Sequence, residues 1–265
     1  VRKMGSLITA FLISLLITYF CTPLIKNISL KFGAVDEPNQ RRINVHPIPN
    51  IGGIAIYLGF IISILIFSPY SSFLTGTLLG GTFILFIGLV DDIYGLSPGI
   101  KLIGQIAAAV ILISFGIEIK FITNPFGGML YLSYWSIPVT ILWIVSITNT
   151  INLIDGLDGL AAGVSTIAVA TLCLVALQEG RILPAIMAVT LAGSSLGFLK
   201  YNFHPAQIFM GDTGALFSGY ILAAISIAGA LKSAAAVTVF VPLLALGIPV
   251  FDTLFAIIRR LYHNK

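Results

Sequence analysis

Residues 74–99 read L-T-G-T-L-L-G-G-T-F-I-L-F-I-G-L-V-D-D-I-Y-G-L-S-P-G, an apolar run that ends abruptly in two adjacent carboxylates. The run approaches the ~20 residues that a helix needs to cross the hydrocarbon core of a bilayer. Two similar acidic breaks follow, at 149–160 and 202–215. The chain has only 10 acidic residues in 265, and half of them lie in the three breaks: Asp91, Asp92, Asp155, Asp158 and Asp212.

The composition excludes an ordinary soluble domain. Mean hydropathy is +1.05, 58% of residues are hydrophobic and only 9% are charged, against about a quarter charged in soluble domains. A net charge of +4 and a pI near 9.1 are usual for a membrane protein with basic loops and do not indicate a nucleic-acid partner. Cys21 and Cys173 lie inside apolar runs, which argues against a disulfide framework.

The apolar runs predict an all-α polytopic integral membrane protein, with all of residues 1–265 in one transmembrane domain. The first run is too long for a signal-peptide core, so we expect it to be a retained span. Nine transmembrane helices are expected, at about 5–25, 51–68, 74–90, 101–117, 135–149, 159–177, 183–199, 213–230 and 234–258.

Nine spans place all three acidic breaks on one side of the membrane. That side carries nine of the 14 Lys and Arg residues, so the positive-inside rule predicts that it is cytoplasmic. The loops on the other side are short, except for residues 118–134, where N-P-F-G-G followed by M-L-Y-L predicts a small hairpin.

The first two breaks carry acids in patterns that indicate ligand binding. Asp91 and Asp92 end a predicted helix, where paired carboxylates oppose the macrodipole unless a cation is near. A solvated helix end is the alternative, but no structural need for both acids is evident, which favours a metal or diphosphate site. Residues 149–160 read N-T-I-N-L-I-D-G-L-D-G-L, where Asn or Asp recurs every third residue on one helical surface. A polar turn that caps the next span is the alternative here.

The third break reads N-F-H-P-A-Q-I-F-M-G-D-T-G-A over residues 202–215. Asp212 and Thr213 precede an expected helix, whose free N–H groups suit a phosphate. Asp212 as a plain helix N-cap is the alternative. Phe209 is a candidate for stacking on a base, and an aromatic anchor at the membrane interface is the alternative.

Other polar residues give weaker indications. His46, His204 and His263 are far apart and lack the spacing of a zinc site. Asp252 lies inside the ninth run, where an acid is a functional candidate. Ion pairing with Arg259 or Arg260 is the alternative for Asp252.

An acidic cluster at one membrane surface favours metal-assisted phosphoryl transfer. Several carboxylates facing one region repel one another and repel an anionic substrate. A divalent cation resolves both problems, and all-oxygen ligands favour Mg²⁺, with Mn²⁺ possible. Lys and Arg side chains then neutralise the substrate phosphates.

Four motifs resemble those of the polyprenyl-phosphate N-acetylhexosamine-1-phosphate transferases. They are D-D-x-x-x-L at 91, N-x-x-N-L-I-D-G-L-D-G at 149, P-A-x-I-F-M-G-D-T-G at 205 and G-I-P-V-F-D-T-L-x-x-x-x-R-R at 247. The last motif is more similar to the branch that starts teichoic acid, common antigen and O-antigen synthesis than to the peptidoglycan branch.

The resemblance implies transfer of a sugar-1-phosphate, best GlcNAc-1-phosphate, from a UDP-sugar to undecaprenyl phosphate at the cytoplasmic face of the bacterial plasma membrane. UMP is released, Mg²⁺ is required, and homodimers are common in the family. All five aspartates of the three breaks are implied to be catalytic, with Asp212, Asp155 and Asp91 as metal ligands. The implied substrate-binding residues are Lys101, Asn149, Asn152, Asn202, Phe209 and His46.

The chain departs from the family pattern at its C-terminal end. Family members usually have ten or eleven spans and a His-rich loop after the R-R, and we expect this chain to lack that loop and the last span. The alternatives are the phospho-MurNAc-pentapeptide transferase of peptidoglycan synthesis, an inactive membrane scaffold and a transporter. A transporter predicts charges near the membrane midplane and repeated halves, whereas the acids of the three breaks cluster at span ends and no repeat is evident.

Overall fold

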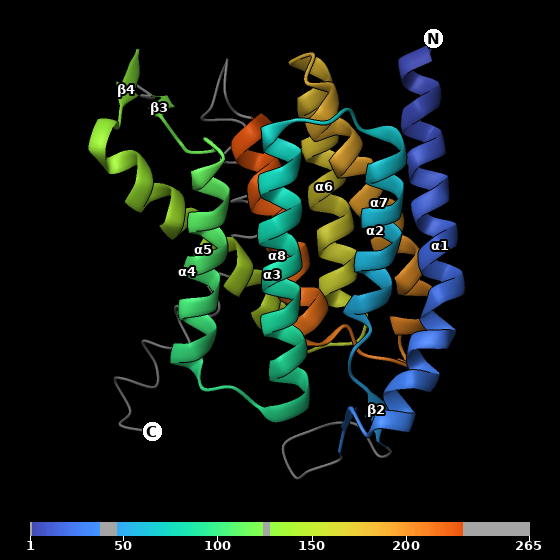
Figure 1. Cartoon of the computed structure of the whole chain (residues 1–265). Helices are drawn as coiled ribbons and strands as arrows, with labels where there is room; N and C mark the ends of the chain where they lie inside the picture. The colour runs from blue at the N-terminus through green and yellow to red at the C-terminus, as the bar shows by residue number, and fades with distance from the viewer. Residues whose placement is uncertain (1, 38–46, 124–127, 230–265) are drawn as a thin grey trace.

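The computed structural model describes residues 2–37, 47–123 and 128–229, which form a bundle of long helices with two short hairpin-like sheets (Figure 1). The elements run α1 (Arg2–Phe32), β1 (Val35–Asp36), β2 (Ile48–Pro49), α2 (Gly53–Phe67), α3 (Ser72–Tyr94), α4 (Pro98–Ser114), β3 (Phe121–Thr123), β4 (Met129–Tyr131), η1 (Ser133–Trp135), α5 (Ser136–Ile154), α6 (Leu160–Gln178), α7 (Ile182–Asn202) and α8 (Gly211–Gly229).

Each of the first eight predicted spans corresponds to one described α-helix, which confirms the all-α class. Six of these helices are long and apolar enough to cross a membrane, whereas α2 and α4 are shorter. The predicted end of the first span at residue 25 is wrong, because α1 continues through Pro23 to Phe32. The ninth predicted span, with Asp252, Arg259 and Arg260, lies outside the described residues.

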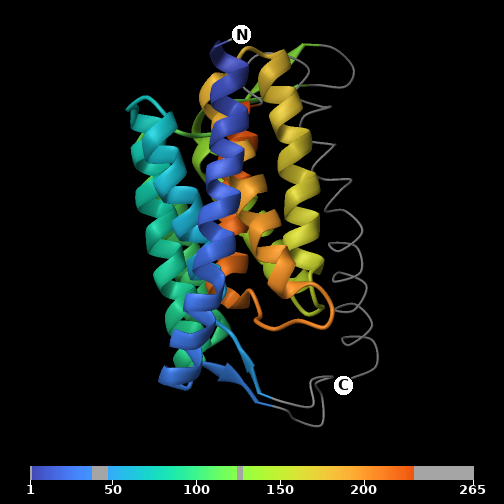
Figure 2. The ribbon, with the colours of Figure 1, turned by 90° about the vertical axis from the view of Figure 1, so that its right-hand side faces the viewer.

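The hairpin expected in residues 118–134 is confirmed. Strands β3 and β4 pair antiparallel, with Phe121 opposite Tyr131 and Thr123 opposite Met129. This hairpin lies at the end of the bundle where α1 begins, at the top of Figure 1. The other small sheet, in which β1 pairs with β2, lies at the opposite end (Figure 2).

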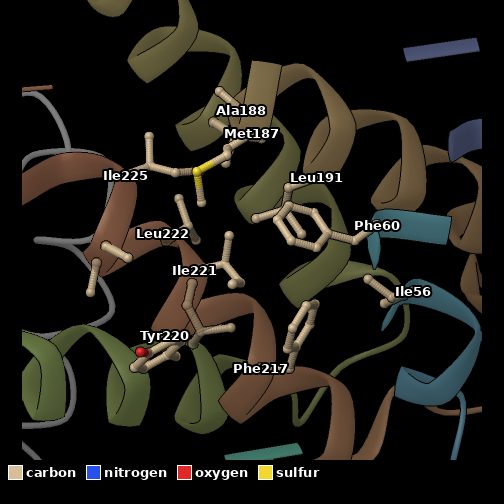
Figure 3. Close-up of a cluster of buried hydrophobic side chains, with 14 of the residues drawn as sticks. Ile56, Phe60, Met187, Ala188, Leu191, Phe217, Tyr220, Ile221, Leu222 and Ile225 are labelled. Atoms are coloured by element: carbon tan, nitrogen blue, oxygen red, sulfur yellow. The ribbon is translucent and has the colours of Figure 1, made fainter. Parts of the chain in front are cut away.

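Helix α8 is the centre of the bundle and α1 lies at its edge. The most apolar part of α8 is 94% buried, whereas the corresponding part of α1 is 28% buried. The core around α8 contains large side chains from several helices, among them Phe60, Leu191 and Phe217 (Figure 3). The rings of Phe60 and Phe217 meet edge to face at 5.6 Å, a favourable aromatic geometry.

The outer surface of the bundle is apolar, as a lipid-facing surface requires. Large hydrophobic side chains such as Ile8, Phe20 and Ile167 are more than half exposed. Glycines make some of the closest contacts between helices, as is typical of membrane proteins. A side chain at Gly193 or Gly197 of α7 would collide with the backbone of α1, so these glycines let the two helices approach closely.

The alternation of helix direction brings the three acidic breaks to one end of the bundle, the lower end in Figure 1. Helices α3, α5 and α7 end there, and α4, α6 and α8 begin there. Hydrogen bonds between residues from different breaks, described below, confirm the predicted convergence.

Candidate active site

The site is built around one cation that contacts two carboxylates. Lys101, in the first turn of α4, places its ammonium 3.1 Å from Asp91 Oδ2 and 2.7 Å from Asp212 Oδ2. Asp91 lies in the last turn of α3 and Asp212 in the first turn of α8, so the ammonium connects the ends of two helices. Lys101 therefore offsets one of the two negative charges and reduces the repulsion between the two acids.

Both carboxylates have further hydrogen bonds that fix their orientation. Asp91 Oδ1 accepts the Leu96 N–H at 2.7 Å, within the turn that leads from α3 to α4. Asp212 Oδ1 accepts a hydrogen bond from the Asn152 side-chain amide at 2.9 Å. The alternative that Asp212 is only a helix N-cap is wrong, because both of its oxygens have partners on other helices.

Asp92 lies beside this group but faces the start of α8. Its Oδ1 accepts the Asp212 N–H at 2.9 Å and its Oδ2 accepts the Thr213 N–H at 2.9 Å. The Thr213 hydroxyl donates to Oδ2 and the Asn50 amide donates to Oδ1. Asp92 therefore has a structural role that the sequence did not make evident, and the expectation that these two N–H groups of α8 are free for a phosphate is wrong.

Asp155 directly follows α5 and lies near the same acids. Burial raises the pKa of the Asp155 carboxyl well above its usual range, and the charges of Asp92 and Asp212 raise it further. A hydrogen bond from the Gly211 N–H acts in the opposite direction. A nearby cation would therefore favour the ionised form of the Asp155 carboxyl.

Asp158 holds the loop between α7 and α8. Its Oδ2 accepts the Ala206 N–H at 3.0 Å and contacts His204 Nδ1 at 2.9 Å. His204 is 79% exposed, so this pair lies at the surface of the site. Asp158 contacts different residues from the other four aspartates, so we expect its role in the site to differ from theirs.

Two predicted substrate-binding amides are bonded within the protein. Asn149 and Gln105 exchange side-chain hydrogen bonds of 3.1 and 2.5 Å, which join α5 to α4. Asn202 is 2% exposed, accepts the Gly159 N–H and donates to the Ile208 carbonyl. Contact of Asn202 with a uridine would require these internal bonds to break.

The remaining predicted substrate-binding residues have different positions. Phe209 is half-buried, and its backbone pairs with Pro49 and Gly52, so the loop before α8 is attached to the start of α2. His46 lies outside the described residues. Asn50 and Gln105 were not among the predicted site residues, because a single Asn or Gln in a sequence gives no signal of its partner.

The donor set fits a divalent cation, the group implied by the family resemblance. The site provides oxygen ligands, and Asp91 and Asp212 already converge on one positive charge. Among the described residues no group of three or more His, Cys, Asp or Glu side chains is arranged to hold a metal. Mg²⁺ typically binds one or two carboxylates together with substrate phosphates and water, and Asp91 and Asp212 provide two carboxylates.

A bundle of apolar helices with a cluster of carboxylates, amides and one lysine at one end defines a polytopic membrane enzyme that acts on charged substrates at the bilayer surface. Residues 74–230 match the family model described as glycosyl transferase family 4. The chain belongs to this family, and it is a multi-pass protein of the bacterial plasma membrane.

Relatives extend the match to the whole chain. A protein of Bacillus subtilis named probable undecaprenyl-phosphate N-acetylglucosaminyl 1-phosphate transferase is 42% identical over 100% of this chain and 74% of its own length. The decaprenyl-phosphate N-acetylglucosaminephosphotransferase of Mycolicibacterium smegmatis is 37% identical over 92% of this chain and 68% of its own length. A phospho-N-acetylmuramoyl-pentapeptide-transferase of a Thermoanaerobacter species is 38% identical over 87% of this chain and 74% of its own length.

Proposed function

We propose that the chain transfers GlcNAc-1-phosphate from UDP-GlcNAc to undecaprenyl phosphate, releases UMP and so starts the synthesis of a cell-envelope polysaccharide. The observation that carries the proposal is the Lys101 ammonium held between Asp91 and Asp212. The ammonium is a cation for a substrate phosphate, and the two carboxylates are candidate ligands for a metal, as diphosphate chemistry at a membrane surface requires. The name of the Bacillus subtilis relative supports GlcNAc as the sugar and undecaprenyl phosphate as the acceptor.

The cytoplasmic face is the proposed location of the site. The positive-inside rule supports it, because nine of the 14 Lys and Arg residues belong to the side of the acidic breaks. The acceptor lipid would keep its chain against the apolar outer surface of the bundle and place its phosphate at the acidic end.

Asp212 and Asp91 are the leading candidates for holding Mg²⁺, with Asp155 nearby. When bound, the metal would neutralise the charge that develops on the phosphates. Asn152 orients Asp212 through its 2.9 Å hydrogen bond. Lys101, freed from one carboxylate, would contact a substrate phosphate.

The acceptor phosphate is the nucleophile in the proposed reaction. A phosphate monoester has a second pKa near ~6, so the lipid phosphate is largely a dianion at neutral pH. Its oxygen forms a bond to the sugar-linked phosphorus, and the bond from that phosphorus to the bridging oxygen breaks, so UMP leaves with both electrons. No proton has to be removed from the nucleophile, so the aspartates act mainly through electrostatics and positioning.

The peptidoglycan-type transferase is the second candidate, since a relative with that name is 38% identical. Initial rates of UMP release with UDP-GlcNAc and with UDP-MurNAc-pentapeptide, each with undecaprenyl phosphate and Mg²⁺, separate the two. We expect UDP-GlcNAc to be the better donor. A higher kcat/KM with the pentapeptide donor would overturn the proposed sugar.

A further inference from the structure

We propose that Asp92 is a positioning residue that caps α8 from the end of α3 and thereby holds the Asp212 carboxylate in place for the reaction. The catalytic part of this inference rests on the proposed function. Its structural part concerns the fold alone and is tested separately.

The contacts of Asp92 are those of a helix cap supplied by another helix. The first N–H groups of a helix have no partner inside the helix. Asp92 accepts two of them, from Asp212 and Thr213, each at 2.9 Å, and it also accepts the Thr213 hydroxyl and the Asn50 amide. A carboxylate at this position also complements the positive end of the helix dipole.

This cap fixes the position of Asp212. The N–H of Asp212 itself and the N–H of Thr213 are both bonded to Asp92, so the first turn of α8 is attached to the end of α3. From this position the Asp212 carboxylate reaches Lys101 and Asn152.

Glycines make the close approach of α3 and α8 possible. A side chain at Gly88 of α3 would collide with the backbone of Asp212 and Thr213, and one at Gly211 would collide with Asn50 and Asp92. Gly211 also has a φ of +69°, a conformation that only glycine adopts at little cost. The chain is thus built to bring Asp92 against the first turn of α8.

The two adjacent acids accordingly have different tasks. Successive side chains on a helix point about 100° apart, so Asp91 and Asp92 face different neighbours. Asp91 contacts Lys101, whereas Asp92 contacts the backbone of α8. Asp91→Asn is therefore a matched control for Asp92→Asn, since each change removes one charge at the same helix end.

Hydrogen–deuterium exchange of peptides covering 208–220, measured on the full chain in detergent, tests the cap directly. In Asp92→Asn an NH₂ group replaces one carboxylate oxygen. This group faces the donors that the oxygen accepted, so those hydrogen bonds are lost. We expect exchange of the Asp212 and Thr213 amides to become about tenfold faster, with no change in Asp91→Asn. Equal exchange in wild type and Asp92→Asn would overturn the inference.

Metal binding and kinetics test the positioning role. Titration with Mn²⁺, followed by its paramagnetic resonance signal, should show about tenfold weaker binding to Asp92→Asn. UMP release should show a lower kcat with an unchanged KM for the lipid. Loss of α8 protection with unaltered Mn²⁺ binding and kcat would reduce Asp92 to a purely structural residue and refute the positioning role.

Thr213→Val provides a milder test if Asp92→Asn folds poorly. It removes only the hydroxyl donor to Asp92, so we expect the same changes, each about threefold. In the double variant the two effects should be less than additive, because both act on one cap. Full additivity would contradict the inference. If wild type releases no UMP the proposed function fails, whereas the exchange data still decide on the cap.

Discussion

Replacement of Lys101 by methionine removes the cation that joins Asp91 to Asp212 and keeps most of the apolar stem. The ammonium makes two charge-assisted hydrogen bonds, at 3.1 and 2.7 Å, each worth about 1.5–3 kcal/mol when fully buried. The Lys101 side chain is 24% exposed, so solvent screening reduces this contribution. We expect Lys101→Met to lose about 2 kcal/mol of unfolding free energy in EDTA, or about 4–8 °C in Tm.

Magnesium should restore part of that loss, because a divalent cation takes over the neutralisation of the two carboxylates. A ligand that binds only the folded state stabilises it by mass action. The Tm of Lys101→Met should therefore rise more on addition of Mg²⁺ than the Tm of wild type. Thermal unfolding in detergent, followed by intrinsic fluorescence with EDTA or with Mg²⁺, measures both shifts.

Lys26→Met is the matched control, since Lys26 lies at the same end of the bundle and makes one 3.4 Å contact with Gln207. Its change should stay within about 0.5 kcal/mol and should not depend on Mg²⁺. An equal response of wild type and Lys101→Met to Mg²⁺ would refute the idea that the ammonium and the metal serve the same carboxylates.

Three further predictions concern individual residues. Asp212→Asn should lower kcat for UMP release by about 10²–10³, and it should also lower Tm because its NH₂ group faces the Lys101 or the Asn152 donor; near-normal turnover would exclude Asp212 as a metal ligand. Asn149→Leu should cost about 1–3 kcal/mol of stability, because it leaves Gln105 unpaired at 2% exposure, and denaturation curves check this. The rate of wild type should fall as pH drops below about 6, where the lipid phosphate gains a proton. The same acidic limb should remain in Asp91→Asn, and its disappearance with Mg²⁺ affinity intact would identify Asp91 as a general base.

Hydropathy predicted the helices well, because each span requires a long apolar run whatever its neighbours are. The convergence of the acidic breaks also followed from the sequence, since the order of spans fixes which loops share a side. The C-terminal end of α1 could not be predicted from the sequence. Residues 26–32 are polar enough to be a loop, yet they continue the helix past Pro23.

The partners of the polar residues could not be predicted, because they depend on which helix ends meet in space. The contacts of Asp92 with Asp212 and Thr213 span about 120 residues of sequence. No local pattern distinguishes Asp92 from Asp91. Likewise, Asn149 belongs to the same i, i+3 series as Asn152, but only Asn152 faces Asp212, whereas Asn149 pairs with Gln105.

The central claim is a metal-dependent phosphosugar transfer at the site formed by Asp91, Lys101 and Asp212. UMP release by the purified chain in detergent, given UDP-GlcNAc, undecaprenyl phosphate and Mg²⁺, tests it most directly. We expect release that requires the lipid, stops with EDTA and is restored by excess Mg²⁺. Release that persists in EDTA, or that proceeds equally without the lipid acceptor, would contradict it.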